Sequence, residues 1–206
     1  MPKKKLDSLQ KLVFVDTETT GLNPIIDRVI EVGLIRIEKG QIVSKYETVV
    51  NPTIEVPDFC IKMTGIKKKE FKKAPTFKDI KDKFFDEMKD ALFIAHNAKF
   101  DFDFLDNEFI RVDLPFGPAS LCTVKLSRIL FPHFPRHDLD TITRRLHIDV
   151  SKRHRAFDDA LALWELFQIL QKRFSQEKLE HVISGLITPP RRIFKSTAKS
   201  QMGMLI

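Results

Sequence analysis

Two acidic residues follow an apolar run near the start of the chain. The run Val13-Phe14-Val15 predicts a buried β-strand, and Asp16 and Glu18 come directly after it. Side chains at positions i and i+2 of a strand point to the same face, so both carboxylates are expected together at one edge of a sheet. Mg²⁺ and Mn²⁺ prefer such oxygen ligands. The pair therefore predicts half of a divalent-metal site, and a solvated strand end is the alternative for these residues alone.

Two later segments carry the other groups that such a site needs. Asp101 lies near the start of a helix expected from Phe100, and Asp159 lies in the first turn of a long apolar-periodic helix. His154 precedes Asp159 by five residues, about a turn and a half along that helix or just ahead of it. Four carboxylates can hold two cations roughly 3.5–4 Å apart, and a histidine can accept a proton from water near neutral pH. These residues predict two-metal hydrolysis of a phosphodiester.

The segments around these residues resemble a known set of motifs. Residues 15–21 read VDTETTG, residues 96–105 read HNAKFDFDFL, and residues 154–160 read HRAFDDA. In this order they resemble the three motifs of the DEDDh 3′–5′ exonucleases, and most of all the proofreading epsilon subunits of bacterial DNA polymerase III. The resemblance implies a ribonuclease H-like fold and two Mg²⁺ (or Mn²⁺) ions. It assigns the metal ligands to Asp16, Glu18, Asp101 and Asp159, with Asp16 bridging the ions, and the general base to His154.

The resemblance also implies contacts to a single-stranded 3′ end. The backbone of Thr17 and the apolar side chain of Leu22 are expected beside the terminal nucleotide. Thr64 lies in a segment that resembles the family's loop for the 3′ nucleotide, and His96 and Phe100 of the second motif are further candidates. Stacking and apolar contact would hold bases in a sequence-tolerant way. Each of these residues has ordinary packing or a turn as its alternative role.

The composition fits one globular enzyme. The 206 residues carry a net charge of +7, which suits a polyanionic partner, although many basic proteins bind no nucleic acid. The chain has two cysteines without metal-like spacing and no signal-peptide pattern, and no apolar run approaches the ~20 residues of a membrane span. A cytoplasmic enzyme without a membrane partner is therefore expected.

The expected elements give an α/β fold, a mixed five-stranded sheet flanked by helices. Strands are predicted at 12–15, 29–37, 42–50, 91–95 and 120–122, with a hairpin turn at Lys39-Gly40. Helices are predicted at 58–64, 76–88, 100–111, 123–130, 139–147 and 156–174. Three antiparallel strands followed by strand–helix alternation indicate helices on the faces of a mixed sheet.

The two ends of the chain suggest a further division. Residues 1–10 form a basic extension, residues 11–187 the exonuclease domain, and residues 188–206 a tail whose composition is typical of a flexible linker. The final residues QMGMLI resemble the sliding-clamp-binding peptides of bacterial replication proteins. In that resemblance Gln201 bonds at the rim of a groove that Met204 and Leu205 or Ile206 fill, although an apolar end can also arise by chance. A replicative polymerase is a second candidate partner, although no segment resembles the polymerase-binding region of a longer epsilon subunit.

These patterns predict a 3′–5′ exonuclease that releases nucleoside 5′-monophosphates from single-stranded DNA in replication proofreading or repair. The motifs do not separate DNA from RNA, so an RNA-trimming exoribonuclease of the same family is an alternative. A stand-alone counterpart of the exonuclease domains fused to repair nucleases is another. A non-catalytic adaptor tethered to a clamp would lack one or more active-site groups, and none is missing from the sequence.

Overall fold

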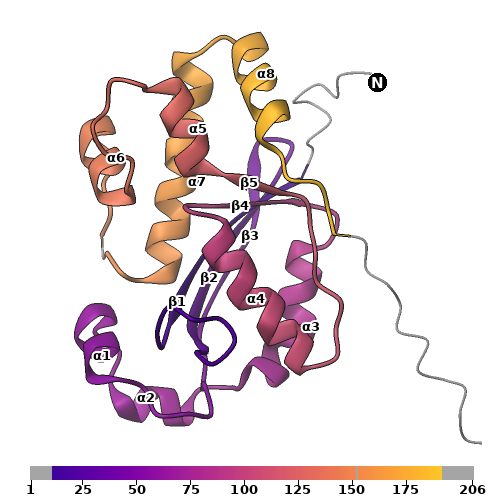
Figure 1. Cartoon of the computed structure of the whole chain (residues 1–206), viewed down its shortest axis with the longest axis vertical. Helices are drawn as coiled ribbons and strands as arrows, with labels where there is room; N and C mark the ends of the chain where they lie inside the picture. Colours follow the sequence, from indigo (N-terminus) through magenta and orange to yellow (C-terminus); the bar gives the residue numbers. More distant parts are fainter. Residues whose placement is uncertain (1–10, 152, 192–206) are drawn as a thin grey trace, which may run out of the picture.

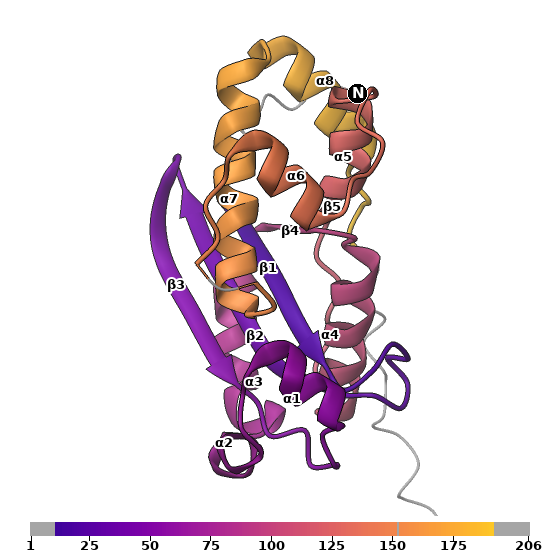
Figure 2. The same cartoon turned by 90° about the vertical axis from the view of Figure 1, so that its left-hand side faces the viewer.

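The computed structural model describes residues 11–151 and 153–191 of the chain. Within them a five-stranded sheet lies between two groups of helices (Figures 1 and 2). The strands are β1 (Lys11–Thr19), β2 (Val29–Glu38), β3 (Gln41–Val49), β4 (Leu92–Ala95) and β5 (Ser120–Cys122), in the order β3-β2-β1-β4-β5. β1, β2 and β3 are antiparallel, whereas β4 runs parallel to β1 and β5 parallel to β4. The mixed sheet predicted from the sequence is confirmed.

The helices follow the predicted order, with two additions. They are α1 (Asp58–Thr64), α2 (Lys68–Lys73), α3 (Phe77–Met88), α4 (Lys99–Arg111), α5 (Thr123–Leu130), α6 (Leu139–Leu146), α7 (Ala156–Arg173) and α8 (Gln176–Leu186). The sequence did not predict α2 and α8. Along the part of the chain that the structure describes, no helix has the length and apolar character needed to cross a membrane.

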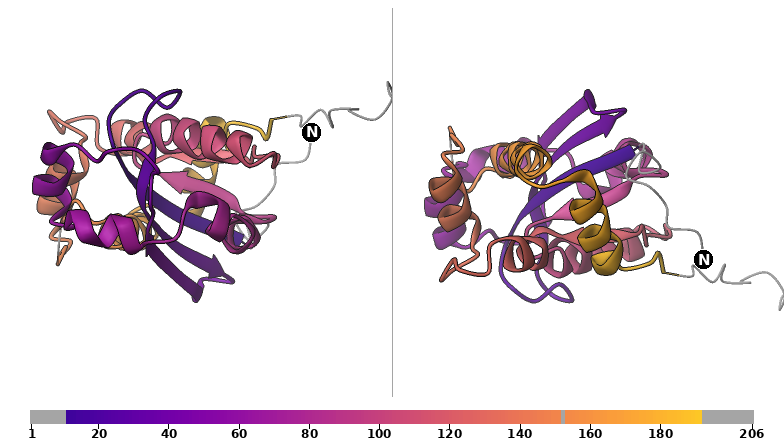
Figure 3. Two further views of the ribbon diagram at one scale, coloured as in Figure 1. Left: turned by 90° about the horizontal axis from the view of Figure 1, so that it is seen from below. Right: turned by 90° about the horizontal axis from the view of Figure 1, so that it is seen from above.

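Alternation along β1 divides the core between the two faces of the sheet. Leu12 and Phe14 pack into one apolar cluster with α5, α6, α7 and α8, whereas Val13 and Val15 pack into a second cluster with α3 and α4. Figure 3 shows α7 (orange) and α4 (pink) on opposite sides of the sheet. The face of each later residue of β1 therefore follows from its position: Asp16 and Glu18 belong to the α7 face, and Thr17 to the α4 face.

Strand β1 is longer than the sequence indicated, and this matters for the site. The predicted strand ended at residue 15, but pairing with β2 continues through Thr19, with Glu18 opposite Glu31. Asp16 and Glu18 thus lie inside the strand and not after it. The ladder of backbone hydrogen bonds outweighs the poor strand propensity of acidic residues here.

The carboxyl ends of β1, β4 and β5 lie at the same edge of the sheet, because these strands run parallel. Helices α4 and α5 begin at that edge, directly after β4 and β5. Helices α1 and α2 lie beyond the ends of β1 and β2 (Figure 1) and pack through a small cluster that includes Cys60 and Phe71. The edge where these elements meet is where the acidic residues gather.

The segment after α8 remains packed on the domain. Thr188 forms a β-bridge with Ser120, and the Arg191 backbone N–H donates to the Gly117 carbonyl at 3.1 Å. The Arg191 guanidinium pairs with Asp103 and Asp106 and lies over the Phe102 ring. The expected start of the tail at residue 188 therefore falls within a packed segment. The expected basic extension 1–10 and clamp-binding residues 201–206 lie outside the described residues.

Candidate active site

Three of the four acidic residues singled out in the sequence form one cluster. Asp16 and Glu18 point from β1 toward α7, and Asp159 lies in the first turn of α7. One carboxylate oxygen from each of the three lies within 4.8 Å of the others. Glu18 and Asp159 are buried, with 7% and 4% of their surface exposed. The groups that the sequence separates by more than a hundred residues therefore meet at one edge of β1.

Helix α7 can approach the sheet this closely because Gly33 has no side chain. Gly33 lies opposite Asp16 in the ladder between β1 and β2. A Cβ atom at Gly33 would lie 2.1 Å from the Ala156 carbonyl carbon and 2.2 Å from the Phe157 backbone nitrogen. The start of α7 therefore rests directly on the backbone of β2, which places Asp159 beside the two acids of β1.

The fourth acid reaches the same edge from the other face of the sheet. Asp101 lies in the first turn of α4 and is 3% exposed. Its Oδ1 accepts hydrogen bonds from the Thr17 backbone N–H at 3.0 Å and from the Thr17 hydroxyl at 2.9 Å. Thr17 lies between Asp16 and Glu18 on β1, so it holds Asp101 next to the cluster. The backbone N–H of Thr17, a predicted nucleotide contact, is used within the protein.

These acids resist ionisation in the absence of a cation, because they are buried and their negative charges repel one another. Burial raises the pKa of Asp16 well above its usual range, and the charges of Asp101 and Glu18 raise it further. Burial and the charge of Glu31 raise the pKa of Glu18 to about 7. Burial raises the pKa of Asp101 to about 7 against the opposing effect of the Thr17 hydrogen bonds. A divalent cation would stabilise the ionised forms of these carboxylates, and their oxygens are the hard ligands that such a cation prefers.

Arg153 supplies a positive charge beside the cluster. Its guanidinium is ion-paired with Asp159 and also with Asp140 at the start of α6. Its charge lowers the pKa of both Asp16 and Glu18. Sequence reasoning did not single out this residue, because no local pattern indicates that an arginine next to the motif histidine pairs with a motif aspartate. A cation bound at Asp159 has to compete with this arginine.

A second arginine and a buried glutamate tie the start of α7 to β2. Glu31 is 1% exposed, and its Oε1 accepts from Arg155 Nε at 2.8 Å while its Oε2 accepts from the Ala156 backbone N–H at 3.1 Å. Arg155 Nη2 also lies 2.7 Å from Oε1. Sequence reasoning missed Glu31, although a lone acid within the apolar run of β2 was a signal for a buried, paired carboxylate.

His154 lies just ahead of α7, between these two arginines. It is exposed and has a positive φ of 61°, a conformation that is uncommon for residues other than glycine. Its neighbours Arg153 and Arg155 are both held by carboxylates, so the backbone on either side is fixed. The candidate base thus has an exposed side chain on a segment that is anchored next to the acids.

Two of the predicted nucleotide contacts line one cavity. Leu22 and Phe100 border a cavity of about 250 Å³, together with Pro24, Asn97, Lys99, Asp103 and Phe104. Leu22 is 84% exposed, and the Phe100 ring packs against the Phe104 ring in a tilted arrangement with centroids 4.8 Å apart. The cavity therefore has apolar walls contributed by the loop after β1 and by the start of α4. Glu18 lies on β1 just before this loop, and Asp101 lies in the first turn of α4.

The other two predicted contacts are occupied within the protein. The two ring nitrogens of His96 lie 2.9 Å from the Thr123 hydroxyl and 2.8 Å from the His137 carbonyl. Burial lowers the pKa of His96 to about 4, so this ring is neutral at pH 7. The buried Thr64 hydroxyl donates to the Cys60 carbonyl and accepts from the Ile66 backbone N–H at the end of α1. The polar atoms of both side chains serve the fold.

Comparison with known proteins identifies the family. The RNase_T exonuclease family model matches residues 13–167. The chain is 37% identical over 163 residues to the PolC-type DNA polymerase III of Caldanaerobacter subterraneus, an overlap of 79% of this chain and 12% of that protein. It is 29% identical to the 3′-5′ exonuclease DinG of Staphylococcus epidermidis, over 81% of this chain and 18% of that protein. The chain thus spans less than a fifth of the length of these relatives.

Solved structures share the fold. E. coli Exonuclease I in complex with a dA16 oligonucleotide superimposes with a TM-score of 0.71 at 18% identity, covering 84% of this chain and 42% of that chain. The nuclease domain of 3′hExo, described as a DEDDh family member and bound to rAMP, superimposes with a TM-score of 0.68 at 21% identity, covering 81% and 94%. Because the family model matches most of the chain, the chain belongs to the RNase_T exonuclease family.

Proposed function

We propose that this chain removes nucleotides one at a time from the 3′ end of single-stranded DNA, using two bound Mg²⁺ or Mn²⁺ ions. The observation that carries the proposal is the convergence of Asp16, Glu18 and Asp159 within 4.8 Å, with Asp101 held alongside by Thr17. When bound, the two ions supply Lewis-acid activation of water and stabilise charge on the departing 3′ oxygen.

The chain's own groups then have distinct tasks. The four acids would bind the two metal ions, and Thr17 fixes the orientation of Asp101 through two hydrogen bonds. Arg153 leaves Asp159 and keeps its second partner, Asp140, when a cation takes its place. His154 accepts a proton from the attacking water, a role that typically contributes 10²–10⁴-fold to the rate. The product is a nucleoside 5′-monophosphate.

Single-stranded DNA fits the cavity between Leu22 and Phe100. Leu22, Phe100 and Phe104 give it apolar and aromatic surfaces that suit stacking and contact with any base. Lys99 at its border is paired with Asp103, so the attraction for a polyanion rests on the net charge of +7. The oligonucleotide in the Exonuclease I structure supports this substrate class, and the rAMP in the 3′hExo structure is the reason to test RNA beside DNA.

The biological setting that we propose is replication proofreading or repair. The PolC-type relative links the domain to DNA polymerase III, and the DinG relative shows that similar exonuclease domains occur in other proteins. Binding of residues 201–206 to a bacterial sliding clamp would tether the domain and raise its local concentration at a primer end. A synthetic peptide of residues 200–206 should bind a clamp with micromolar affinity, roughly −8 kcal/mol at best. No binding at high micromolar clamp would remove the tether from the proposal.

A digestion assay tests the proposed activity. Asp16→Ala and Asp159→Ala should each abolish Mg²⁺-dependent digestion of single-stranded DNA, because each removes a ligand of the cluster. Asp106→Ala is the matched control, since Asp106 is an acid on α4 that pairs with Arg191 away from the cluster. Digestion at the wild-type rate by either cluster variant would refute the metal assignment. Faster digestion of an RNA oligomer than of the DNA strand would replace DNA by RNA as the substrate.

A further inference from the structure

The loop between β1 and β2 presents unusually exposed apolar side chains next to the active site. Leu22, Ile25 and Ile26 are 84%, 73% and 68% exposed. Within the loop, the Thr20 hydroxyl donates to Asp27 Oδ1 at 3.1 Å, and the Asn23 backbone N–H donates to Asp27 Oδ2 at 2.9 Å. These bonds shape the loop, but they do not attach it to the rest of the domain.

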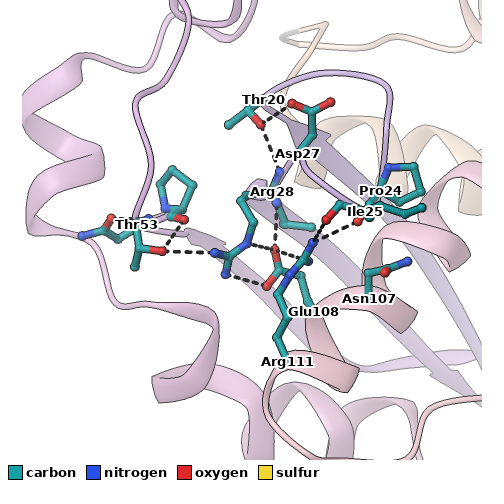
Figure 4. Close-up of polar contacts among 12 residues, drawn as sticks. Thr20, Pro24, Ile25, Asp27, Arg28, Thr53, Asn107, Glu108 and Arg111 are labelled. Carbon is teal, nitrogen blue, oxygen red and sulfur yellow. Dashed lines mark hydrogen bonds and ion pairs between the residues drawn. The ribbon is translucent and has the colours of Figure 1, made fainter.

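A buried carboxylate on α4 provides the attachment (Figure 4). Glu108 is 1% exposed and lies about two turns along α4 from Asp101. Arg28, at the end of the loop, donates to both of its oxygens, from Nε to Oε1 at 2.7 Å and from Nη2 to Oε2 at 2.9 Å. The Val29 backbone N–H donates to Oε1 at 3.2 Å. The bidentate pair between Arg28 and Glu108 fixes the end of the loop against α4.

Arg111 extends the attachment to the outer part of the loop. Its Nη1 lies 3.5 Å from Glu108 Oε1, one turn back along α4. Its Nη2 donates to the Pro24 carbonyl at 3.1 Å and to the Ile25 carbonyl at 2.8 Å. Figure 4 shows the Arg111 guanidinium between Glu108 and these two carbonyls. One side chain therefore joins the loop backbone to the helix that carries Asp101 and Phe100.

The same loop and helix are the two walls of the cavity described above. Leu22 and Pro24 contribute one wall, and Phe100 and Phe104 of α4 contribute the other. The separation of the walls decides whether a base can be gripped between them. Arg111 bonds the carbonyl of Pro24, a lining residue, so it controls that separation without lining the cavity itself.

We propose that Arg111 is a positioning residue that holds Leu22 and Pro24 opposite Phe100 and so sets the grip of the cavity on a base near the 3′ end. The inference rests on the proposed function, because it concerns the same cavity and the same strand. Arg111 acts on substrate affinity and leaves the chemical step to the acids and His154. Its Nη2 already bonds two loop carbonyls and its Nη1 lies beside Glu108, so the positioning role needs no contact with a phosphate of the strand.

The first test is Arg111→Ala, measured on the full chain with a single-stranded DNA substrate. Loss of two hydrogen bonds from a charged donor should raise KM about tenfold, while kcat stays within about twofold. Arg173→Ala, which removes an exposed arginine from the last turn of α7, is the control for net charge. If Arg111→Ala folds poorly, Arg111→Lys is the second variant. It keeps the charge but cannot reproduce both hydrogen bonds to the loop carbonyls, so it should give an intermediate KM. A wild-type KM in both variants would overturn the proposal.

A double-mutant cycle with Leu22 separates a positioning role from a direct contact. Leu22→Ala alone should weaken binding of a labelled strand, and adding Arg111→Ala should weaken it little further, because both changes remove the same wall. Additive losses would overturn the proposal. The salt dependence of binding should keep its slope in Arg111→Ala, whereas loss of a phosphate contact lowers the slope by about one. A lowered slope would also overturn it.

These outcomes are distinct from failure of the proposed function. A wild-type protein that digests no single-stranded DNA would refute the function and with it this inference. If the wild-type protein digests the strand and Arg111→Ala leaves KM unchanged, only the positioning role is refuted.

Discussion

Replacing Glu31 by glutamine should slow catalysis without removing a metal ligand. Glu31 is buried and holds the start of α7 through Arg155 and the Ala156 backbone N–H, at 2.8 and 3.1 Å. A glutamine has the same shape but one acceptor oxygen and no charge, so the ion pair with Arg155 is lost and only one of Arg155 and the Ala156 N–H keeps an acceptor. Displacement of His154 and Asp159 by about 1 Å would cost on the order of 10²-fold in rate. We expect kcat to fall by about that factor, with KM nearly unchanged.

The stability cost of Glu31→Gln can be estimated from the same contacts. Hydrogen bonds to charged groups contribute about 1.5–3 kcal/mol each. Arg155 is 28% exposed, so water replaces part of the loss, and relief of repulsion between Glu31 and Glu18 offsets a further part. A net loss of about 2 kcal/mol corresponds to a fall in Tm of roughly 4–8 °C. The variant should therefore remain folded at assay temperature.

Steady-state kinetics over a range of Mg²⁺ concentrations, beside thermal melts, would test this expectation. Glu38→Gln is a matched control, because Glu38 lies on the same strand and pairs with Arg36 in a similar way, remote from the acids. Glu31 is not part of the cluster of Asp16, Glu18 and Asp159, so its replacement should leave the set of Mg²⁺ ligands intact. Wild-type kcat would contradict this expectation, and so would activity restored by excess Mg²⁺, since rescue by metal would show that Glu31 acts through metal binding.

Three further predictions follow from the geometry of the site. Burial raises the pKa of Glu18 and Asp101 to about 7, so ionising these two groups opposes folding. Their protonated forms contribute fully to the free energy of unfolding below about pH 4, and this contribution is lost as the pH rises through 7. The Tm in EDTA should fall between pH 5 and pH 8, and the gain in Tm on adding Mg²⁺ should be larger at pH 8; a flat or rising Tm in EDTA would contradict this. Gly33→Ala would place a Cβ 2.1 Å from the Ala156 carbonyl carbon, so it should destabilise the fold by about 1–3 kcal/mol and lower kcat, measured by melts and kinetics; unchanged kcat and Tm would rule out the close approach. Arg153→Ala should tighten Mg²⁺ binding in calorimetric titration and lower the Tm in EDTA, because the arginine is the cation that Asp159 holds without metal; unaltered metal affinity would speak against that competition.

Local signals predicted most of the elements, and two misses have physical reasons. The helix Asp58–Thr64 and the strand Ser120–Cys122 were predicted to the residue. Helix α2 is rich in lysine and buries Phe71 as its apolar anchor, so periodicity gave little indication of it. Helix α8 has a Ser175 cap, but it buries only Leu179 and Ile183. Tertiary contacts decide whether such short segments become helices.

The motifs predicted the acids that converge in the candidate site, but local patterns did not predict the residues that hold them in place. Glu31 and Arg155 are 124 positions apart, and Arg28 and Glu108 are 80 apart. Pairings over such distances depend on how β2, α4 and α7 pack, which no local pattern specifies. The extension of β1 through Thr19 likewise depends on its pairing with β2. The clustered acids could therefore be predicted from the sequence, whereas the residues that position them required the structure.

The assignment of the clustered acids to a 3′–5′ exonuclease is tested most directly by the direction and product of digestion. A 5′-labelled single-stranded DNA would be incubated with the wild-type protein in Mg²⁺ and, in parallel, in EDTA. We expect a ladder that shortens from the 3′ end, with release of nucleoside 5′-monophosphates, in Mg²⁺ alone. Cleavage from the 5′ end, internal cleavage, or equal digestion in EDTA would contradict it.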